Sequence, residues 1–304
     1  MRIPVIIGPT ASGKTELSQR MGEYLPIEVV SADSRKIYRY LDIGTAKPSY
    51  YLRLRTRFHM IDICDPDHYF SAGDYGDTAG GKLKEIIGKD RIPLVVGGSG
   101  LYIEAIFKPL PPLPKPDPRI RSEIDNQEKT KGLPWLYHQL QKFDKEWAEA
   151  VDSHDRQRIK RGIEIFRMTG QPISELIKKR PKGLFRPFYI YIVVERNRLM
   201  ERVKQRTERM FRDGLIDETR WLLNIGYRED LNALRTIGYQ ETIDYLKGSI
   251  TEKELKSKVV RNTLLLAKRQ ITWFKRFKNT YQVSEPFPIK RLVSAIKRLD
   301  TNPL

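Results

Sequence analysis

Short apolar runs alternate with helical patterns through the first third of the chain. Residues 3–7, 27–31, 58–62 and 92–96 are apolar runs of strand length, and a helical pattern extends from about Ser71 to Lys89. Strands that alternate with helices along a chain form a parallel sheet with helices on both faces. The pattern therefore predicts an α/β fold.

A proline-rich run interrupts this alternation at residues 109–118. Proline lacks an N–H and has a fixed φ, so a run with this many prolines cannot lie inside a helix or a central strand, and we expect an extended linker. From about residue 119 to residue 179, apolar positions recur three and four apart and no strand-like run occurs. This region is predicted to be an inserted, all-helical subdomain.

Strand character returns in the apolar, alternating stretch at residues 188–194, which we expect to rejoin the sheet. Helical patterns then continue to the end of the chain, with one short strand candidate at residues 281–284. The predicted organisation is a core of residues 1–118 plus 180–304 and a helical insertion of residues 119–179.

A glycine-rich segment directly follows the first predicted strand and matches the pattern G-x-x-x-x-G-K-[ST]. In this pattern backbone N–H groups turn around an anion at the start of a helix, the lysine adds a positive charge, and the hydroxyl that follows can hold Mg²⁺. A glycine-rich turn that only begins a helix would not require both Lys14 and Thr15. We therefore predict a P-loop that binds phosphate through Gly8, Pro9, Thr10, Ala11, Ser12, Gly13, Lys14 and Thr15, with Thr15 as the Mg²⁺ ligand.

Two polar residues are expected at the same edge of the sheet as this loop. Asp33 follows the second predicted strand, where it can act as a general base or a magnesium ligand, or can cap a helix over residues 34–40. Ser99 lies in a glycine-rich segment after the strand at residues 92–96, where it can bind a substrate or cap the next helix. Nucleotide hydrolases commonly carry a carboxylate here, so their usual arrangement is in doubt.

The charge of the chain indicates a polyanionic partner. The formal net charge is +18, and basic residues cluster at residues 156–161 and, mixed with aromatic residues, at residues 268–278. Each cluster alone is typical of a solvated helix face, but together they favour contact with RNA or DNA. A membrane is the weaker candidate, because no apolar run approaches the ~18–20 residues of a spanning helix.

The single cysteine and the four histidines bear on disulfides, cellular location and zinc binding. Cys64 is the only cysteine, so an internal disulfide is impossible and a reducing, cytoplasmic location is expected. The four histidines show no metal-ligand spacing, and we assign no zinc site.

Taken together, several motifs resemble the bacterial tRNA dimethylallyltransferases. They span nearly the whole chain in the order of that family, and they are residues 8–15, 33–34, 42–48, 96–102, 237–239 and 268–274. The resemblance implies transfer of a dimethylallyl group from dimethylallyl diphosphate to N6 of adenosine 37, next to the anticodon of a tRNA, with release of pyrophosphate. It also implies that the P-loop holds this diphosphate, although nucleotide binding there, for example of ATP, stays open.

The resemblance also implies roles for single residues. Asp33 matches the catalytic aspartate of the family and would accept the proton of N6. Lys14, Arg121 and a magnesium ion held partly by Thr15 would stabilise the charge on pyrophosphate, and Thr10 and Ser99 would complete the hydrogen bonding.

The family positions that contact tRNA fall in four segments and at two single residues, and the target base must be turned out of the anticodon loop to be reached. The insertion would grip the anticodon stem from the side opposite the core. The expected contacts are Asp33, Ser34, Arg35, Lys36, Ser99, Arg121, Gln157, Arg158, Ile159, Lys160, Arg161, Arg235, Gly238, Tyr239, Gln240, Lys268, Arg269, Gln270, Ile271, Thr272, Trp273, Phe274 and Lys275.

Two departures from the family are visible, because Ser99 replaces a usual threonine and Lys36 replaces a glutamine that is common in bacterial members. The first keeps the hydroxyl, whereas the second changes a side chain beside the catalytic loop.

Two other classes of function stay open. One is a small-molecule enzyme, either an isopentenyltransferase that acts on free AMP or a P-loop kinase, and the other is a non-catalytic RNA-binding protein. The basic clusters and the insertion argue against the first, and the presence of Lys14, Thr15 and Asp33 argues against the second. We expect a monomer.

Overall fold

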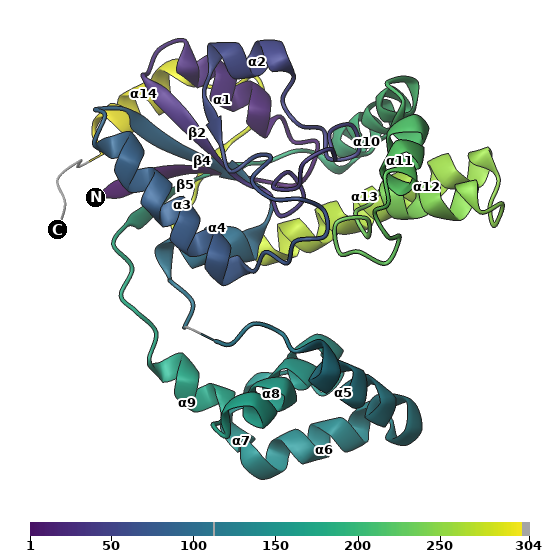
Figure 1. Cartoon of the computed structure of the whole chain (residues 1–304). Coiled ribbons are helices and arrows are strands. Elements are labelled where there is room, and N and C mark those ends of the chain that lie inside the picture. The colour runs from purple at the N-terminus through teal and green to yellow at the C-terminus, as the bar shows by residue number, and fades with distance from the viewer. Residues whose placement is uncertain (112, 300–304) are drawn as a thin grey trace. The chain divides into compact units, whose positions relative to one another are not determined.

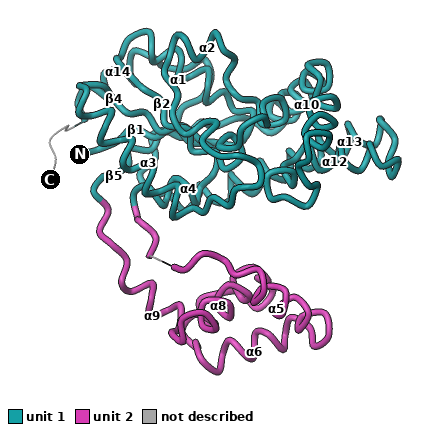
Figure 2. The backbone as a smooth tube through the Cα atoms, in the orientation of Figure 1, with its two compact units in different colours: residues 1–107, 184–304 teal, residues 108–183 magenta. Residues whose placement is uncertain are grey.

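The computed structural model describes residues 1–111 and 113–299. The chain folds into two compact units, one of Met1–Phe107 together with Leu184 onward and one of Lys108–Gly183 (Figure 2). The predicted insertion boundaries at residues 119 and 179 lie inside the second unit. Pro112 of the predicted linker and residues 300–304 of the predicted core lie outside the described residues.

The first unit is built on a six-stranded sheet with the order β3-β2-β4-β1-β5-β6, in which every pairing is parallel. Its strands are β1 (Arg2–Ile7), β2 (Ile27–Ala32), β3 (Phe58–His59), β4 (Ile92–Gly97), β5 (Arg186–Ile192) and β6 (Tyr281–Val283). The predicted α/β fold is confirmed.

Helices cover both faces of the sheet (Figure 1). On one face α1 (Lys14–Gly22) and α14 (Ile289–Lys297) bury their apolar side chains against the strands, and on the other face α3 (Ala72–Ile87) and α4 (Gly100–Phe107) do so. Because both faces are covered, residues 3–7 of β1 and all of β2 are buried.

Four further helices lie beyond the carboxyl ends of the strands (Figure 1). They are α10 (Arg196–Arg212), α11 (Leu215–Asn224), α12 (Tyr239–Leu246) and the long α13 (Glu252–Phe274), and the short α2 (Tyr50–Arg55) precedes β3. Side chains of α10 to α13 belong to the same hydrophobic core as those of α3 and α4. Ligands of open parallel sheets bind at this edge, so these helices adjoin the expected site.

The second unit is helical in all of its described regular elements. Its helices are α5 (Pro118–Lys131), α6 (Leu133–Phe143), α7 (Lys145–Ala150), α8 (Arg156–Thr169) and α9 (Ile173–Lys178). The Asp117 side chain caps α5 by accepting hydrogen bonds from the N–H groups of Arg119 and Ile120. A separate apolar cluster that includes Ile124, Leu136 and Ile159 forms its core.

Three local predictions differ from the structure. The strand at residues 58–62 is confined to Phe58 and His59, because Met60 and Asp62 adopt a positive φ that ends the strand. The strand predicted at residues 188–194 is β5 (Arg186–Ile192), which lies two residues nearer the N-terminus. Residues 34–40 form turns and one β-bridge rather than a helix.

No described helix is both long and apolar enough to cross a bilayer.

Candidate active site

The P-loop connects β1 to α1 at the carboxyl edge of the sheet. Gly13 directly precedes α1 with a φ of 91°, in the left-handed region that favours glycine. The α1 helix begins at Lys14, so its first N–H groups face the loop. The Lys14 ammonium folds over the loop and donates hydrogen bonds to the carbonyl oxygens of Gly8 and Pro9, at 3.0 and 2.6 Å.

Three cations converge on this loop around one carboxylate. Burial and, to a smaller extent, the nearby charge of Lys36 lower the pKa of Lys14 to about 7, while Asp33 opposes this effect. Burial also lowers the pKa of Lys36 to about 8, and burial lowers the pKa of Arg206, on α10, from its usual value. The excess of buried positive charge makes this region suitable for an anion.

Asp33 lies one residue beyond the end of β2 and is half-buried. Its Oδ1 accepts a hydrogen bond from the N–H of Arg35 at 2.9 Å, whereas its Oδ2 accepts none from the part of the chain that the structure describes. The helix-capping alternative for Asp33 is wrong, because no helix follows it. Its carboxylate is therefore held at one oxygen and available at the other.

Ser99 joins the ends of β2 and β4. Its Oγ accepts a hydrogen bond from the N–H of Ser34 at 3.0 Å and donates one to the Oγ of Ser34 at 3.2 Å. The backbone N–H of Ser99 donates to the carbonyl oxygen of Ala32 at 3.1 Å. The hydroxyl therefore supports the segment that carries Asp33.

The glycines around Ser99 allow other parts of the chain to approach closely. A Cβ atom on Gly97 would lie 2.0 Å from the carbonyl oxygen of Ala32, and one on Gly98 would lie 2.4 Å from Nε2 of Gln270. One on Gly100 would lie 2.1 Å from Nε1 of Trp273. The segments that approach these glycines closely are β2 and α13.

Gln270, on α13, bridges the P-loop and this glycine segment. Its Oε1 accepts a hydrogen bond from the N–H of Thr10 at 2.7 Å, and its Nε2 donates one to the carbonyl oxygen of Gly98 at 3.0 Å. The guanidinium of Arg206 donates a hydrogen bond to Oγ1 of Thr10 at 3.0 Å. Residues from distant parts of the sequence therefore form one site.

Hard oxygen donors suited to Mg²⁺ also lie at this site. Thr15 is in the first turn of α1, and its hydroxyl makes no hydrogen bond within the described residues. The buried Ser12 hydroxyl likewise lacks a partner there. These oxygens fit a magnesium ion that a bound diphosphate would share. Within residues 1–111 and 113–299, no three His, Cys, Asp or Glu side chains form a metal site.

Comparison with known proteins now identifies the family. The model of the IPP transferase family matches residues 36–277. The chain belongs to the IPP transferase family. The tRNA dimethylallyltransferase of Thermotoga petrophila is 42% identical over 279 residues, which cover 91% of this chain and 90% of that protein. The Geobacter sulfurreducens enzyme of the same name is 42% identical over 278 residues, which cover 90% of this chain and 89% of that enzyme.

Solved structures agree with this assignment. The tRNA isopentenylpyrophosphate transferase of Bacillus halodurans has a TM-score of 0.71 at 33% identity, covering 97% of this chain and 95% of that chain. A eukaryotic dimethylallyltransferase acting on tRNA has a TM-score of 0.77 at 22% identity, covering 99% of this chain and 76% of that chain, and shares its fold. The resemblance inferred from the motifs is confirmed.

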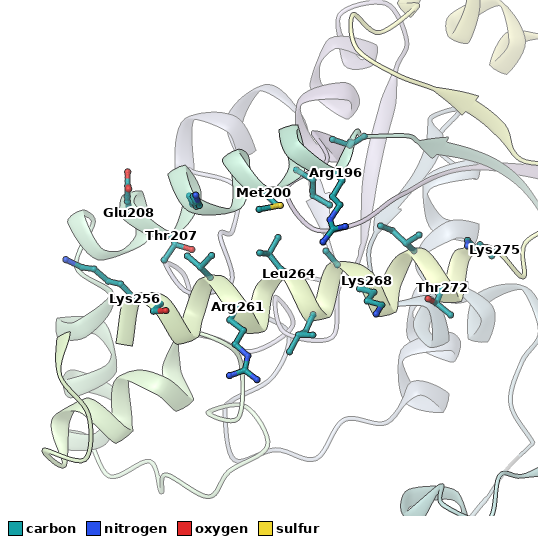
Figure 3. Close-up of a pocket in the computed structure, with 18 residues that line it drawn as sticks. Arg196, Met200, Thr207, Glu208, Lys256, Arg261, Leu264, Lys268, Thr272 and Lys275 are labelled. Atoms are coloured by element: carbon teal, nitrogen blue, oxygen red, sulfur yellow. The ribbon is translucent and has the colours of Figure 1, made fainter. Parts of the chain in front are cut away.

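Residues along α13 of this IPP transferase differ in what surrounds them. Lys268, Thr272 and Lys275 line a groove of about 1020 Å³ between α10 and α13, whose basic rim includes Arg196 and Arg261 (Figure 3). Within the predicted RNA-contacting segment, the structure exposes Lys268, Arg269, Thr272 and Lys275, half-buries Gln270, Ile271 and Trp273, and buries Phe274.

Two other predicted RNA-contacting segments are also partly internal. Arg235 and Gln240 are exposed, whereas Gly238 and Tyr239 are buried and offer no surface to RNA. In the second unit, Gln157 and Arg158 are exposed and Lys160 and Arg161 are half-buried, but Ile159 belongs to the apolar core. Gly238, Tyr239 and Ile159 are thus buried in this structure, and their predicted contact with RNA stays a prediction.

The structure describes Arg121 within the second unit. Its guanidinium donates hydrogen bonds to the buried carboxylate of Glu164, at 2.9 and 3.3 Å, and is itself about half exposed. The P-loop belongs to the first unit, so the predicted role of Arg121 at the diphosphate stays a prediction.

Sequence reasoning missed Arg206 as a site residue. The α10 helix carries many arginines, and nothing in their spacing distinguishes the one that reaches Thr10. Arg206 differs from the other arginines of α10 in that burial lowers its pKa and its guanidinium lies on Thr10 of the P-loop, which only the folded structure shows.

Proposed function

We propose that this protein is a tRNA dimethylallyltransferase that transfers the dimethylallyl group of dimethylallyl diphosphate to N6 of adenosine 37 and releases pyrophosphate. The observation that carries the proposal is that a cationic P-loop lies at the same edge of the sheet as Asp33, whose carboxylate has one oxygen without a hydrogen bond from the described residues. The chain that carries this arrangement belongs to the IPP transferase family. The P-loop suits the diphosphate, and Asp33 suits the acceptor.

Asp33 acts as the general base in this proposal. The exocyclic N6 of adenine is a weak nucleophile because its lone pair is shared with the ring, so removal of its proton assists attack on the allylic carbon. Oδ1 is held by the Arg35 N–H, which leaves Oδ2 for the N6 proton. Ser99 and Ser34 fix the backbone around this carboxylate.

The leaving group requires stabilisation of negative charge as the allylic C–O bond breaks. Lys14, Arg206 and the N–H groups at the start of α1 surround the position of the diphosphate. The Thr15 hydroxyl would help to hold Mg²⁺, which would supply further charge neutralisation. The family role of Arg121 would add a cation from the second unit.

The acceptor RNA requires a cationic surface near the site. Lys268, Arg269 and Lys275 are exposed on the helix whose Gln270 touches the P-loop, so a polyanion held by α13 is close to the reacting groups. A base within an anticodon loop must leave its stack to enter such a site. We further propose that the protein acts as a cytoplasmic monomer on the anticodon stem-loop.

The experiment that tests the function is a transfer assay with radiolabelled dimethylallyl diphosphate and Mg²⁺. Unmodified tRNA and free AMP are offered in parallel, and the label is located after nuclease digestion. Label on adenosine 37 of tRNA alone is expected. Label on AMP would assign the chain to the small-molecule isopentenyltransferases, and label on neither acceptor would overturn the proposal.

A further inference from the structure

A single carboxylate holds the segment at residues 42–48, here called the 42–48 loop. Glu218, on α11, accepts hydrogen bonds from the backbone N–H groups of Asp42, at 3.2 Å, and Ile43, at 3.1 Å. The hydroxyl of Tyr239, at the start of α12, donates a hydrogen bond to the same carboxylate. The beginning of the loop is therefore attached to two helices beyond the sheet.

Tyr239 contacts the next residue of the loop as well. Its hydroxyl oxygen accepts a hydrogen bond from the N–H of Gly44 at 3.1 Å. Its ring lies so close to Gly44 that a Cβ atom there would be 2.3 Å from a ring carbon. The side chain of Tyr239 is fully buried, and its hydroxyl both donates and accepts a hydrogen bond in these contacts.

The 42–48 loop forms one wall of a cavity of about 870 Å³. Asp42, Ile43, Ala46, Lys47 and Pro48 line this wall, and the P-loop contributes Ala11 and Gly13 to the same cavity. Arg206, which donates a hydrogen bond to Thr10, also lines it. All of these residues belong to the first unit, and the 42–48 loop, the P-loop and Arg206 therefore line the same cavity.

We propose that Glu218, together with Tyr239, is a positioning residue for the diphosphate donor, because it fixes the 42–48 loop as the wall of the cavity beside the P-loop. This inference rests on the proposed function. It assigns to the motif at residues 237–239, expected from sequence to contact RNA, a role on the donor side of the site.

Tyr239→Phe and Glu218→Gln test the proposal, with Asp217→Asn as the matched control. Asp217 is the neighbouring acid on α11, it is exposed, and its carboxylate pairs only with Arg220 among the described residues. Hydrogen exchange of the peptide that covers residues 41–48 reports the loop without turnover. Steady-state kinetics at saturating tRNA report KM for dimethylallyl diphosphate, and a binding assay reports tRNA affinity.

Faster exchange of residues 41–48 is expected in both variants, with a donor KM raised roughly tenfold, as loss of a buried hydrogen bond allows. Affinity for tRNA should change less than about twofold, and Asp217→Asn should match the unchanged protein. The donor KM of the double variant should be no higher than that of the more impaired single variant, since both substitutions act through one loop.

A loop that exchanges normally, or one that exchanges faster while the donor KM stays constant, would overturn the positioning role. A lower melting temperature with unchanged donor KM would show that the network only stabilises the fold. Failure of the proposed function is seen separately, as absence of transfer to tRNA by the unchanged protein, and the exchange result then still decides whether Glu218 and Tyr239 hold the loop.

Discussion

At the scale of single residues, the site combines a carboxylate with lysines whose protonation depends on what is bound. Asp33 keeps one oxygen free of hydrogen bonds from described residues. Lys14 and Lys36 have pKa values lowered to about 7 and about 8 because burial disfavours their charged forms. A bound diphosphate would reverse this effect and favour the charged forms.

Replacement of Asp33 by Asn should abolish most transfer. The amide keeps an oxygen for the Arg35 N–H but cannot accept the N6 proton, so we expect a loss of about 10²–10⁴-fold in kcat. Affinity for tRNA, measured by filter binding, should stay within about twofold. The exposed Asp67→Asn serves as the control. Weak RNA binding with normal turnover of bound RNA would remove Asp33 from the base role.

Binding of pyrophosphate should be coupled to uptake of protons. At pH 8 Lys14 is mostly neutral and Lys36 is about half neutral, because their pKa values are about 7 and about 8. An anion raises both pKa values, so protons enter the site on binding and affinity falls as pH rises through this range.

Calorimetry in buffers of different ionisation enthalpy counts these protons. Lys36→Gln, which removes the titratable ammonium but keeps a polar side chain, should take up fewer protons than the unchanged protein at pH 8. The comparison cancels the protonation of pyrophosphate itself. Equal uptake by the two proteins would show that Lys36 does not sense the anion.

At the scale of elements, the packing of β2, β4 and α13 decides the shape of the site. Gly97 lies where a side chain would strike the carbonyl of Ala32, and Gly98 and Gly100 lie against Gln270 and Trp273. This contact allows Gln270 to reach both the P-loop and the glycine segment. The glycines are therefore required by close packing.

Alanine substitution at two glycines should have opposite effects on stability. Gly97→Ala places a Cβ 2.0 Å from a backbone oxygen, so we expect a loss of about 3 kcal/mol in the free energy of unfolding. Gly81→Ala, on the exposed side of α3 with open space around it, should gain about 0.5–1 kcal/mol. Urea denaturation measures both. A stable Gly97→Ala variant would show that β2 and β4 can separate.

At the scale of the whole molecule, positive charge and substrate binding are linked. The net charge of +18 exceeds what solubility requires. Exposed cations border the α10–α13 groove beside the site (Figure 3). Exposed arginines also lie on α8 of the second unit. Each unit thus carries a cationic surface suited to the phosphates of a folded RNA.

Removal of Lys268 or Lys275 should flatten the salt dependence of tRNA binding. Each phosphate contact that is lost should reduce the slope of log affinity against log salt by roughly 0.7–0.9. Lys297→Ala is the control, because Lys297 is an exposed lysine on α14. This helix packs with α1 on the face of the sheet opposite to α3 and α4, whereas α13 packs on their side. Fluorescence anisotropy over a salt series measures the slopes, and an unchanged slope in both variants would exclude phosphate contact at these positions.

The sequence by itself determined the order of strands and helices, the P-loop, the inserted helices and the family, because periodicity and motifs are local properties of the chain. Only the tertiary structure decided that Arg206 reaches Thr10, 196 positions away, and that Gln270 spans the site. It also showed that Tyr239 is internal rather than exposed to RNA. Burial and long-range hydrogen bonds depend on how elements pack, and the spacing of residues along the chain does not predict that packing.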